Sequence, residues 1–238
     1  MSFGKPWRHC RRCASTNDVA RELAAAGAPH GTVVTADEQT AGRGRQGRSW
    51  TAPPGKALLF SGILRPLHPG HALLPLAAPL AVAEASEAIA RVRCAIKWPN
   101  DVWIDERKCA GILIEARPSD GWAVIGVGLN VSIEPDEFPD ELRDAATSLG
   151  GDAGVREALA ALNGALARWT QAEPAEVLAA FRDRDALRGR QVSWDGGSGR
   201  ARGVDERGNL IVEIAAGERL TLGAGEVHLV TGGAGGRT

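Results

Sequence analysis

The stretch AGRGRQGRSWTAPPGK, Ala41 to Lys56, decides between two very different folds. It contains the spacing G-x-G-x-x-G from Gly42 to Gly47, which in outline is the fingerprint of a dinucleotide-binding turn. In that turn a helix follows the glycines at once, because its N-terminus binds the pyrophosphate. Here the pair Pro53-Pro54 follows and forbids a regular helix, and no Lys-Ser or Lys-Thr pair completes a P-loop. The sequence therefore predicts neither of these nucleotide-binding turns.

Three arginines of this loop, Arg43, Arg45 and Arg48, remain to be explained. Each carries a planar guanidinium that can bind a phosphate or a carboxylate through two hydrogen bonds. The glycines between them keep an empty loop mobile, so we expect it to close over an anionic ligand. A solvated loop with scattered arginines is the alternative on this stretch alone.

Composition sets wide limits on the function. At 238 residues, with 44% hydrophobic and 24% charged residues, the chain suits one ordinary domain plus a small second one. The net charge of -1 argues against a protein that coats nucleic acid. The N-terminus lacks the apolar region of a secretory signal, and the most apolar run, 72–82, is too short to cross a bilayer of about 30 Å. We expect a cytosolic protein that does not enter a membrane.

The four cysteines raise the alternative of a metal or redox site. Cys10 and Cys13 lie two residues apart beside His9, but a zinc site needs a second pair. Cys94 and Cys109 each stand alone in apolar, strand-like sequence. We therefore expect reduced and mostly buried thiols.

Hydrophobic periodicity predicts an α+β domain, with clustered strands and helices around them, rather than a regularly alternating parallel sheet. Pro79, inside one helical segment, predicts a kink or a late start of that helix. The expected helices are 15–27 with Ser15 as a capping residue, 73–92, 155–169, and the segment that begins at Pro174. The expected strands are 31–40, 56–66, 94–98, 109–116 and 122–133.

Near Leu187 the sequence changes to short alternating segments separated by Gly-rich and Asp-containing turns. Five short strands of this kind match the size of an SH3-like barrel. They are Gln191–Trp194, Arg200–Val204, Leu210–Ile214, Arg219–Leu222 and Val227–Val230. The last residues, 232–238, are expected to form a disordered tail.

Three further stretches carry polar residues next to apolar strands. KWPNDVW (97–103) places Asn100 and Asp101 as an exposed pair in a turn. RKCAGILIEA (107–116) places Lys108 just ahead of Gly111 and a buried strand, where it is either extended towards solvent or aimed at an anion. GVGLNV ends a strand with Asn130, whose amide could bind a base edge or a ribose. Each stretch alone is more typical of a structural role.

Together, and in chain order, Ser15-Thr16-Asn17, Gln39, GRGRQGRSW, KWPNDVW, KCAGILIEA and GVGLNV resemble the biotin–protein ligases. The resemblance is close from about Ala14 to Asn130. It implies a mixed-sheet catalytic domain of the class II aminoacyl-tRNA synthetase and biotin ligase type over 1–187, and a small SH3-like barrel over 188–231. It also implies an enzyme that activates biotin with ATP to biotinyl-5′-AMP and transfers the biotinyl group to one lysine of a biotin carboxyl carrier protein.

The resemblance assigns roles residue by residue. It implies that Lys108, Arg45 and Asp101 are catalytic, with Asp101 orienting or deprotonating the incoming lysine. Mg²⁺ would bridge phosphates, with Asn100 as a candidate ligand. Trp50 would lie on the adenine side of the closed loop. The residues implied to bind biotin are Ser15, Thr16, Asn17, Gln39, Arg43, Gly44, Arg45, Lys108 and Gly111. Those implied to bind ATP or the adenylate are Arg43, Arg45, Arg48, Trp50, Asn100, Lys108 and Asn130.

Two departures from the family pattern matter. Many bacterial members carry an N-terminal helix-turn-helix domain, but only 14 residues precede Ser15, so we expect a monofunctional ligase that does not bind DNA. Gln46 stands where many relatives have another arginine, which lowers the positive charge of the loop. The acceptor beyond a carboxyl carrier protein, and the choice between monomer and homodimer, stay open at this point.

Two other functions are alternatives to the ligase. A lipoate–protein ligase shares the fold and the adenylation chemistry, but the loop and the Ser-Thr-Asn group favour a ureido ligand over a dithiolane. A nucleic-acid-binding module would interleave aromatic and basic residues across the barrel. The barrel segment instead has Trp194 as its one aromatic residue, together with six acidic residues.

Overall fold

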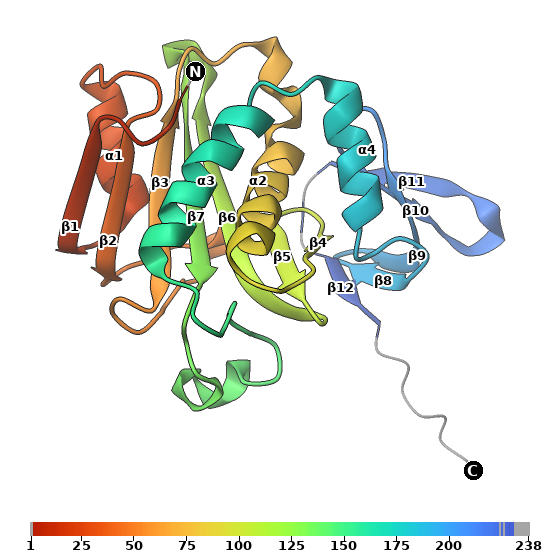
Figure 1. Ribbon diagram of the computed structural model, residues 1–238. Coiled ribbons are helices and arrows are strands. Elements are labelled where there is room, and N and C mark those ends of the chain that lie inside the picture. Colours follow the sequence, from red (N-terminus) through yellow and green to blue (C-terminus); the bar gives the residue numbers. More distant parts are fainter. Residues whose placement is uncertain (1, 224, 226, 231–238) are drawn as a thin grey trace.

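The structure is a computed structural model that describes residues 2–223, 225 and 227–230 (Figure 1). The tail expected at 232–238 lies outside the described residues. Two β-sheets, four α-helices and several short 3-10 helices make up the described chain. The larger sheet carries helices on both faces, and the smaller sheet lies beside its β4 end, next to α4 (Figure 1).

The larger sheet is mixed and has the strand order β1-β2-β3-β7-β6-β5-β4. β1 runs parallel to β2, and the other neighbours are antiparallel. This arrangement confirms the expected α+β class with a mixed sheet. The strands are β1 (Trp7–Cys13), β2 (Val33–Gln39), β3 (Ala57–Leu64), β4 (Ala95–Lys97), β5 (Asp101–Ile104), β6 (Arg107–Arg117) and β7 (Trp122–Asn130).

Helices α2 (Leu74–Ile89) and α3 (Val155–Trp169) lie side by side over one face of this sheet (Figure 1). Helix α1 (Thr16–Ala25) packs on the opposite face, where Ala20 and Ala24 meet Ile63 and Val124. Because both faces are covered, every residue of β3 is buried, which explains why its sequence is apolar apart from Ser61.

Helix α2 is longer than the apolar run of 72–82. It begins at Leu74 and includes Pro79, so the expected late start is wrong. Together with the preceding 3-10 turn it spans Pro69–Ile89, 21 residues, and its most apolar 18-residue window has a mean hydropathy of 1.4, which by length and composition alone would suit a membrane span. However, 67% of its most apolar window is buried inside the protein, as in the core helix of a globular domain.

Strands β1 and β5 were not predicted. β1 has the sequence WRHCRRC, which shows no apolar alternation because it is an edge strand with mostly exposed side chains. The expected turn at Asn100 and Asp101 is wrong for the second residue. Asp101 begins β5 and is only 9% exposed, because its strand pairs with both β4 and β6.

The smaller sheet is antiparallel and has the order β11-β10-β9-β8-β12, which confirms the five strands expected near the C-terminus. Helix α4 (Pro174–Arg184), which starts at the expected proline, comes directly before it. The strands are β8 (Gln191–Trp194), β9 (Gly197–Val204), β10 (Leu210–Glu213), β11 (Arg219–Leu222) and β12 (Val227–Leu229).

One hydrophobic cluster runs through both sheets. It joins Val192 and Leu210 of the smaller sheet to α2 and the larger sheet. Between them the Trp98 indole N–H donates to the carbonyl of Gly208 at 3.0 Å. A division into 1–187 and 188–231 therefore remains a proposal, and the two parts share a core.

A partly buried carboxylate joins α2 to α4. The Arg184 guanidinium donates to both Glu87 carboxylate oxygens at 2.7 and 2.8 Å, and the Cys94 N–H donates to the same carboxylate at 2.9 Å. Partial burial acts to raise the pKa of Glu87, but the hydrogen bonds from Arg184 and Cys94 outweigh it and hold this pKa below its ordinary value of 4.5.

We expect Glu87→Gln to lower the free energy of unfolding by about 1 to 3 kcal/mol at pH 7, because a charge-assisted hydrogen-bond pair is lost. A folded-state pKa below the ordinary value contributes stability above about pH 4.5 that disappears as the pH falls through the folded pKa. Urea unfolding at several pH values should therefore show the two proteins converging in acid. Glu176→Gln, which breaks a half-exposed ion pair with Arg168, is the matched control and should cost less than about 1 kcal/mol.

Candidate functional site

A cavity of about 810 Å³ opens on the sheet face that carries α1. It lies between that helix and the segment 133–146, over residues of β3, β6 and β7. The structure brings every residue that the sequence singled out to this one cavity. They are Ser15, Thr16, Asn17, Gln39, Arg43, Gly44, Arg45, Arg48, Trp50, Asn100, Asp101, Lys108, Gly111 and Asn130.

One end of the cavity is closed by the start of α1. Ser15 occupies the N-cap position with extended backbone angles, but its side chain makes no capping hydrogen bond, contrary to the expectation from sequence. The Thr16 N–H donates instead to Oε1 of Gln39, the last residue of β2, at 2.7 Å. The Thr16 hydroxyl oxygen lies 3.0 Å from the same atom. The closed end is therefore lined with polar groups; Ser15 and Thr16 are buried and Gln39 is partly covered.

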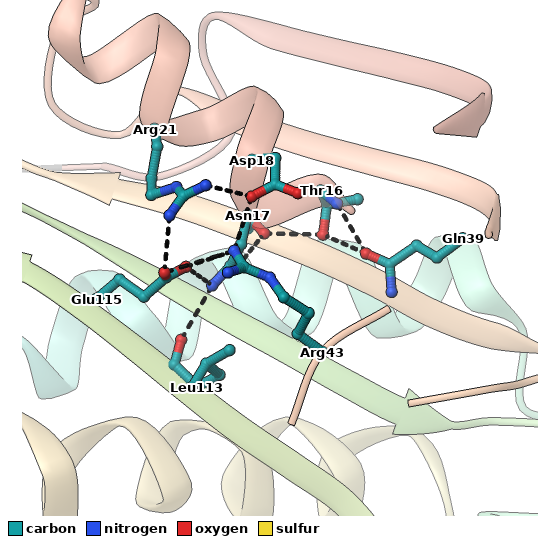
Figure 2. Close-up of polar contacts among 9 residues, drawn as sticks. Thr16, Asn17, Asp18, Arg21, Gln39, Arg43, Leu113 and Glu115 are labelled. Atoms are coloured by element: carbon teal, nitrogen blue, oxygen red, sulfur yellow. Dashed lines mark hydrogen bonds and ion pairs between the residues drawn. The ribbon is translucent and has the colours of Figure 1, made fainter. Parts of the chain in front are cut away.

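A glycine makes room for Asn17 on the sheet. Ser61, Gly126 and Leu113 are direct neighbours across β3, β7 and β6. The Asn17 amide lies over this row: a Cβ on Gly126 would come within 2.2 Å of Asn17 Oδ1. Asn17 Oδ1 is 2.6 Å from the Ser61 hydroxyl, and Asn17 Nδ2 donates to Glu115 at 2.7 Å (Figure 2). Asn17 thus ties α1 to two strands, besides lining the cavity.

Two carboxylates and two arginines surround this corner, as Figure 2 shows. Arg43, from the loop, donates to Asp18 at 2.7 Å and lies 3.2 Å from Glu115. Arg21, from α1, pairs with the same two carboxylates. The sequence motifs did not point to Asp18, Glu115 or Arg21. The four side chains are partly exposed, and Arg21 pairs with both carboxylates, so each acid keeps a cationic partner when the loop arginine moves away.

The arginine-glycine loop is a small hairpin in this structure. The Trp50 N–H donates to the Gly42 carbonyl at 2.9 Å, and the Gly44 N–H donates to the Arg48 carbonyl at 2.6 Å. Its tip turns through Gln46, which has a φ of 54° and therefore adopts the left-handed conformation that costs a non-glycine residue about 1 kcal/mol. The hairpin directs its arginine-bearing strands along the cavity rim.

Trp50 ends this hairpin and covers part of the cavity floor. Its ring lies over Gly128, where a Cβ would meet the indole at 2.3 Å, and beside Gly111, where a Cβ would meet it at 3.1 Å. Its indole N–H is buried and has no hydrogen-bond partner among the described residues. Only a glycine at position 128 allows this contact between the ring and the sheet.

We therefore expect Gly128→Ala to displace the Trp50 ring from the floor. In a protein labelled with ¹⁵N, the indole N–H resonance of Trp50 should shift and its exchange with water should accelerate by at least about tenfold, because a buried donor becomes exposed. Gly164→Ala is the matched control, since nothing lies within 4 Å of a Cβ at that position of α3. An unchanged Trp50 resonance in Gly128→Ala would show that the neighbouring backbone absorbs the methyl group.

A lysine and an aspartate face each other at the opposite end of the floor. Lys108 Nζ lies 2.6 Å from Asp101 Oδ1, and both side chains are largely covered, with exposed fractions of 29% and 12%. A β-bulge between β5 and β6 interrupts the register next to them. Lys108 Nζ also lies 5.8 Å from the centroid of the Trp50 ring. The structure thus holds the ammonium at the cavity wall, with a carboxylate on one side and an aromatic face on the other.

Asn100 and Asn130 each use their amide nitrogen to hold backbone. Asn100 Nδ2 donates to the Ile112 carbonyl at 3.1 Å, and Asn130 Nδ2 donates to the Thr147 carbonyl at 2.9 Å. These bonds fix the orientation of both amides. The carbonyl oxygen of each side chain is the group left for a ligand in the described structure.

Segment 133–146, which carries no motif in the sequence, closes the second end of the cavity. Phe138 packs against Leu59 on the α1 side of the sheet. Lys56 Nζ donates to the Glu137 carboxylate at 2.6 Å, and this bond, with one from the Glu134 N–H, holds the pKa of Glu137 below its ordinary value. The segment contains two short 3-10 turns and no longer helix or strand. Its sequence therefore shows no apolar periodicity that could have predicted it.

The cysteines are free thiols, and two of the four are fully buried as expected. Cys10 and Cys13 are only partly covered, so the expectation of mostly buried thiols is wrong for them. Burial raises the pKa of Cys13 to about 11, the opposite of what a nucleophilic redox cysteine needs. In the described part of the chain, no group of three His, Cys, Asp or Glu side chains could hold a metal ion.

Comparison with known proteins gives the site its context. Residues 10–132 match the model of the Biotin/lipoate A/B protein ligase family, and residues 189–230 match the Biotin protein ligase C terminal domain. The chain is 35% identical over 251 residues to a protein of Mycobacterium tuberculosis named biotin--[acetyl-CoA-carboxylase] ligase, covering 96% of this chain and 92% of that one. The chain belongs to the biotin/lipoate A/B protein ligase family.

Two further members show how far the likeness extends. The fold matches the biotin protein ligase from Aquifex aeolicus in complex with biotin and ATP with a TM-score of 0.82 and 29% identity, over 95% of this chain and 99% of that one. The bifunctional ligase/repressor BirA of Bacillus subtilis is 45% identical over 148 residues. That alignment covers 60% of this chain and 46% of BirA, so the chain spans about half the length of this relative.

Proposed function

We propose that this family member is a biotin–protein ligase that activates biotin with ATP and transfers it to a lysine of a biotin carboxyl carrier protein. One observation carries the proposal: a single cavity joins a closed polar end at Thr16 and Gln39 to a lysine and three loop arginines. The closed end suits a small ring with urea-like hydrogen-bonding groups, and the basic residues suit a carboxylate and phosphates. The names of the relatives point the same way.

In the first step a carboxylate oxygen of biotin attacks the α-phosphorus of ATP. A P–O bond forms, the bond to the β-phosphate breaks, and pyrophosphate leaves with its electron pair. Because a carboxylate is already ionised at neutral pH, this step needs charge neutralisation and alignment rather than a base. Lys108 supplies positive charge at the carboxylate, and Arg43, Arg45 and Arg48 supply it along the rim.

In the second step the neutral amine of the acceptor lysine attacks the acyl carbon of biotinyl-5′-AMP. The C–N bond forms, the nitrogen gives up one proton, the bond between the acyl carbon and the phosphate oxygen breaks, and AMP leaves. Asp101 lies 2.6 Å from Lys108 and so keeps that ammonium in place. Taking a proton from the acceptor would be a second role for the same carboxylate.

Mg²⁺ is part of the proposal as a companion of ATP. The donor set fits an ion that binds mainly phosphate oxygens and water, since Mg²⁺ needs only one or two protein oxygens. Asn100, whose amide nitrogen is held by Ile112, offers its carbonyl oxygen for this purpose. The ion would neutralise phosphate charge during pyrophosphate release.

The loop would also exclude water. Trp50, Asn130 and the arginine-bearing hairpin would enclose the adenylate, which water would otherwise hydrolyse. The partly exposed pairing of Arg43 with Asp18 and Glu115 lets the hairpin open and close at small cost. The proposal places the reaction in the cytosol, where ATP and carrier domains are available.

Mass spectrometry of a carrier domain incubated with the protein, ATP, Mg²⁺ and biotin tests the function. We expect a mass gain of one biotinyl group on one lysine, and no gain when biotin or ATP is left out. A parallel reaction with lipoate in place of biotin distinguishes the two branches of the family. Modification with lipoate alone would overturn the proposal.

A further inference from the structure

A chain of hydrogen bonds runs from Glu115 to the closed end of the cavity (Figure 2). Glu115 accepts from Asn17 Nδ2 at 2.7 Å, and Asn17 Oδ1 lies 2.6 Å from the Ser61 hydroxyl oxygen. The Ser61 oxygen lies 2.8 Å from the Thr16 hydroxyl oxygen. Ser61 is fully buried, and neither it nor Glu115 is among the described residues that line the cavity.

The chemistry of the groups fixes the direction of this chain. A carboxylate only accepts, so Asn17 must turn its NH₂ group to Glu115 and its carbonyl oxygen to Ser61. A short contact to a carbonyl oxygen needs a proton, which must come from the Ser61 hydroxyl. Ser61 has a single proton, so the hydrogen bond between the two hydroxyl groups uses the proton of Thr16.

A hydrogen bond from the backbone also fixes the orientation of the Gln39 side-chain amide. The Thr16 backbone N–H donates to Gln39 Oε1 at 2.7 Å, so the NH₂ group of Gln39 lies on the other side, towards Gly42. The hydroxyl oxygen of Thr16 is 3.0 Å from Gln39 Oε1, the longest of the three oxygen–oxygen separations. Because the Thr16 proton already points to Ser61, Thr16 presents lone pairs and Gln39 presents N–H groups at the end of the cavity.

We propose that Glu115 and Ser61 are positioning residues that set this polarity and so select a cyclic urea. A urea ring carries an N–H beside a C=O, which complements an acceptor beside a donor, whereas a dithiolane ring offers neither group. The inference rests on the proposed function and extends it to the choice between ureido and dithiolane substrates. Arg21 and Arg43 form ion pairs with Glu115 at the head of the chain.

The same polarity rejects a close analogue. In a cyclic carbamate analogue of biotin, a ring oxygen replaces one urea N–H, so its lone pairs would face those of Thr16. Two such carbamates exist, because either urea N–H can be replaced. We expect the native protein to bind the one whose ring oxygen faces Thr16 at least about 100-fold more weakly than biotin, because the ring oxygen and the Thr16 oxygen are both acceptors. In Ser61→Ala the Thr16 proton loses its fixed acceptor and can turn to Gln39 Oε1 or to the ligand, so the polarity is no longer set and this ratio should fall below about tenfold.

Isothermal titration with biotin, lipoate and both carbamates, on the native protein and its variants, tests the inference. Glu115→Gln should lower the ratio in the same direction, because an amide at 115 allows Asn17 to reverse, and its partly exposed position tolerates the change. Ser86→Ala is the matched control: it removes another fully buried hydroxyl, bonded to the Val82 carbonyl on α2, and should leave the ratio at its native value.

Two results would overturn the proposal in distinguishable ways. If Ser61→Ala and Glu115→Gln weaken biotin and carbamate by the same factor, the residues have a merely structural role and the inference alone fails. If the native protein binds lipoate and not biotin, the proposed function fails as well. Circular dichroism of each variant accompanies the titrations, and Glu115→Gln carries the test if Ser61→Ala does not fold.

Discussion

Lys108→Ala is expected to slow adenylate formation by about 100- to 1,000-fold, the cost of removing one preorganised charge from a site where charge is redistributed. Lys108 is the ammonium that the structure holds at the cavity wall, fixed by Asp101 at 2.6 Å. Without it, the carboxylate and the phosphates would meet with one positive charge fewer, and the Asp101 carboxylate would be left without its cation at 9% exposure. Both effects disfavour the approach of two anions.

The measurement is biotin-dependent exchange of pyrophosphate into ATP, which reports the first step alone. Lys97→Ala is the control, because Lys97 lies nearby at the end of β4, over the Trp103 ring and outside the cavity lining. Lys108→Arg should recover part of the rate, since it restores charge but not the geometry of a compact ammonium. An exchange rate for Lys108→Ala within about threefold of the native rate would remove Lys108 from the first step.

The sequence singled out the residues that line the cavity, but not the residues that position them. Most of the motif residues lie in a loop, at the start of α1 or near the end of a strand, and such positions carry recognisable chemistry even without a structure. Gly126 and Gly128 could have been found in the same way, because two glycines at alternate positions of an apolar strand indicate close approach to the sheet. Their partners, Asn17 and Trp50, come from distant segments that no spacing rule connects.

Ser61 and Glu115 show why the residues that position the site could not be identified from the sequence. Ser61 is a polar residue within an apolar strand, and Glu115 follows an apolar run near the end of another, so each has an ordinary local explanation. Their significance arises only when β3, β7 and β6 pair in register and α1 places Asn17 between them. Likewise, β1 escaped prediction because an edge strand with two exposed faces needs no apolar alternation.

Arg45→Gly is expected to turn a selective ligase into one that labels lysines indiscriminately. Arg45 lies on the hairpin at the cavity rim, where its guanidinium can bind the phosphate of biotinyl-5′-AMP through two hydrogen bonds. Loss of a charge-assisted pair of this kind costs about 1.5 to 3 kcal/mol, so the adenylate should dissociate roughly 10- to 100-fold faster. Biotinyl-5′-AMP released into solution is still a reactive mixed anhydride and acylates any exposed amine.

Two measurements separate this outcome from simple loss of activity. Free biotinyl-5′-AMP should accumulate in the filtrate of a reaction without carrier, and serum albumin added to the reaction should become biotinylated on many lysines. Gln46→Gly is the matched control: it adds a glycine at the neighbouring tip position, where φ is already 54°, and removes no charge. Gln46→Gly loosens the same turn, so indiscriminate labelling by this variant would mean that the rigidity of the loop retains the adenylate. Indiscriminate labelling by Arg45→Gly alone would mean that the guanidinium retains it. Continued modification of a single carrier lysine by Arg45→Gly would show that the adenylate is retained without this arginine.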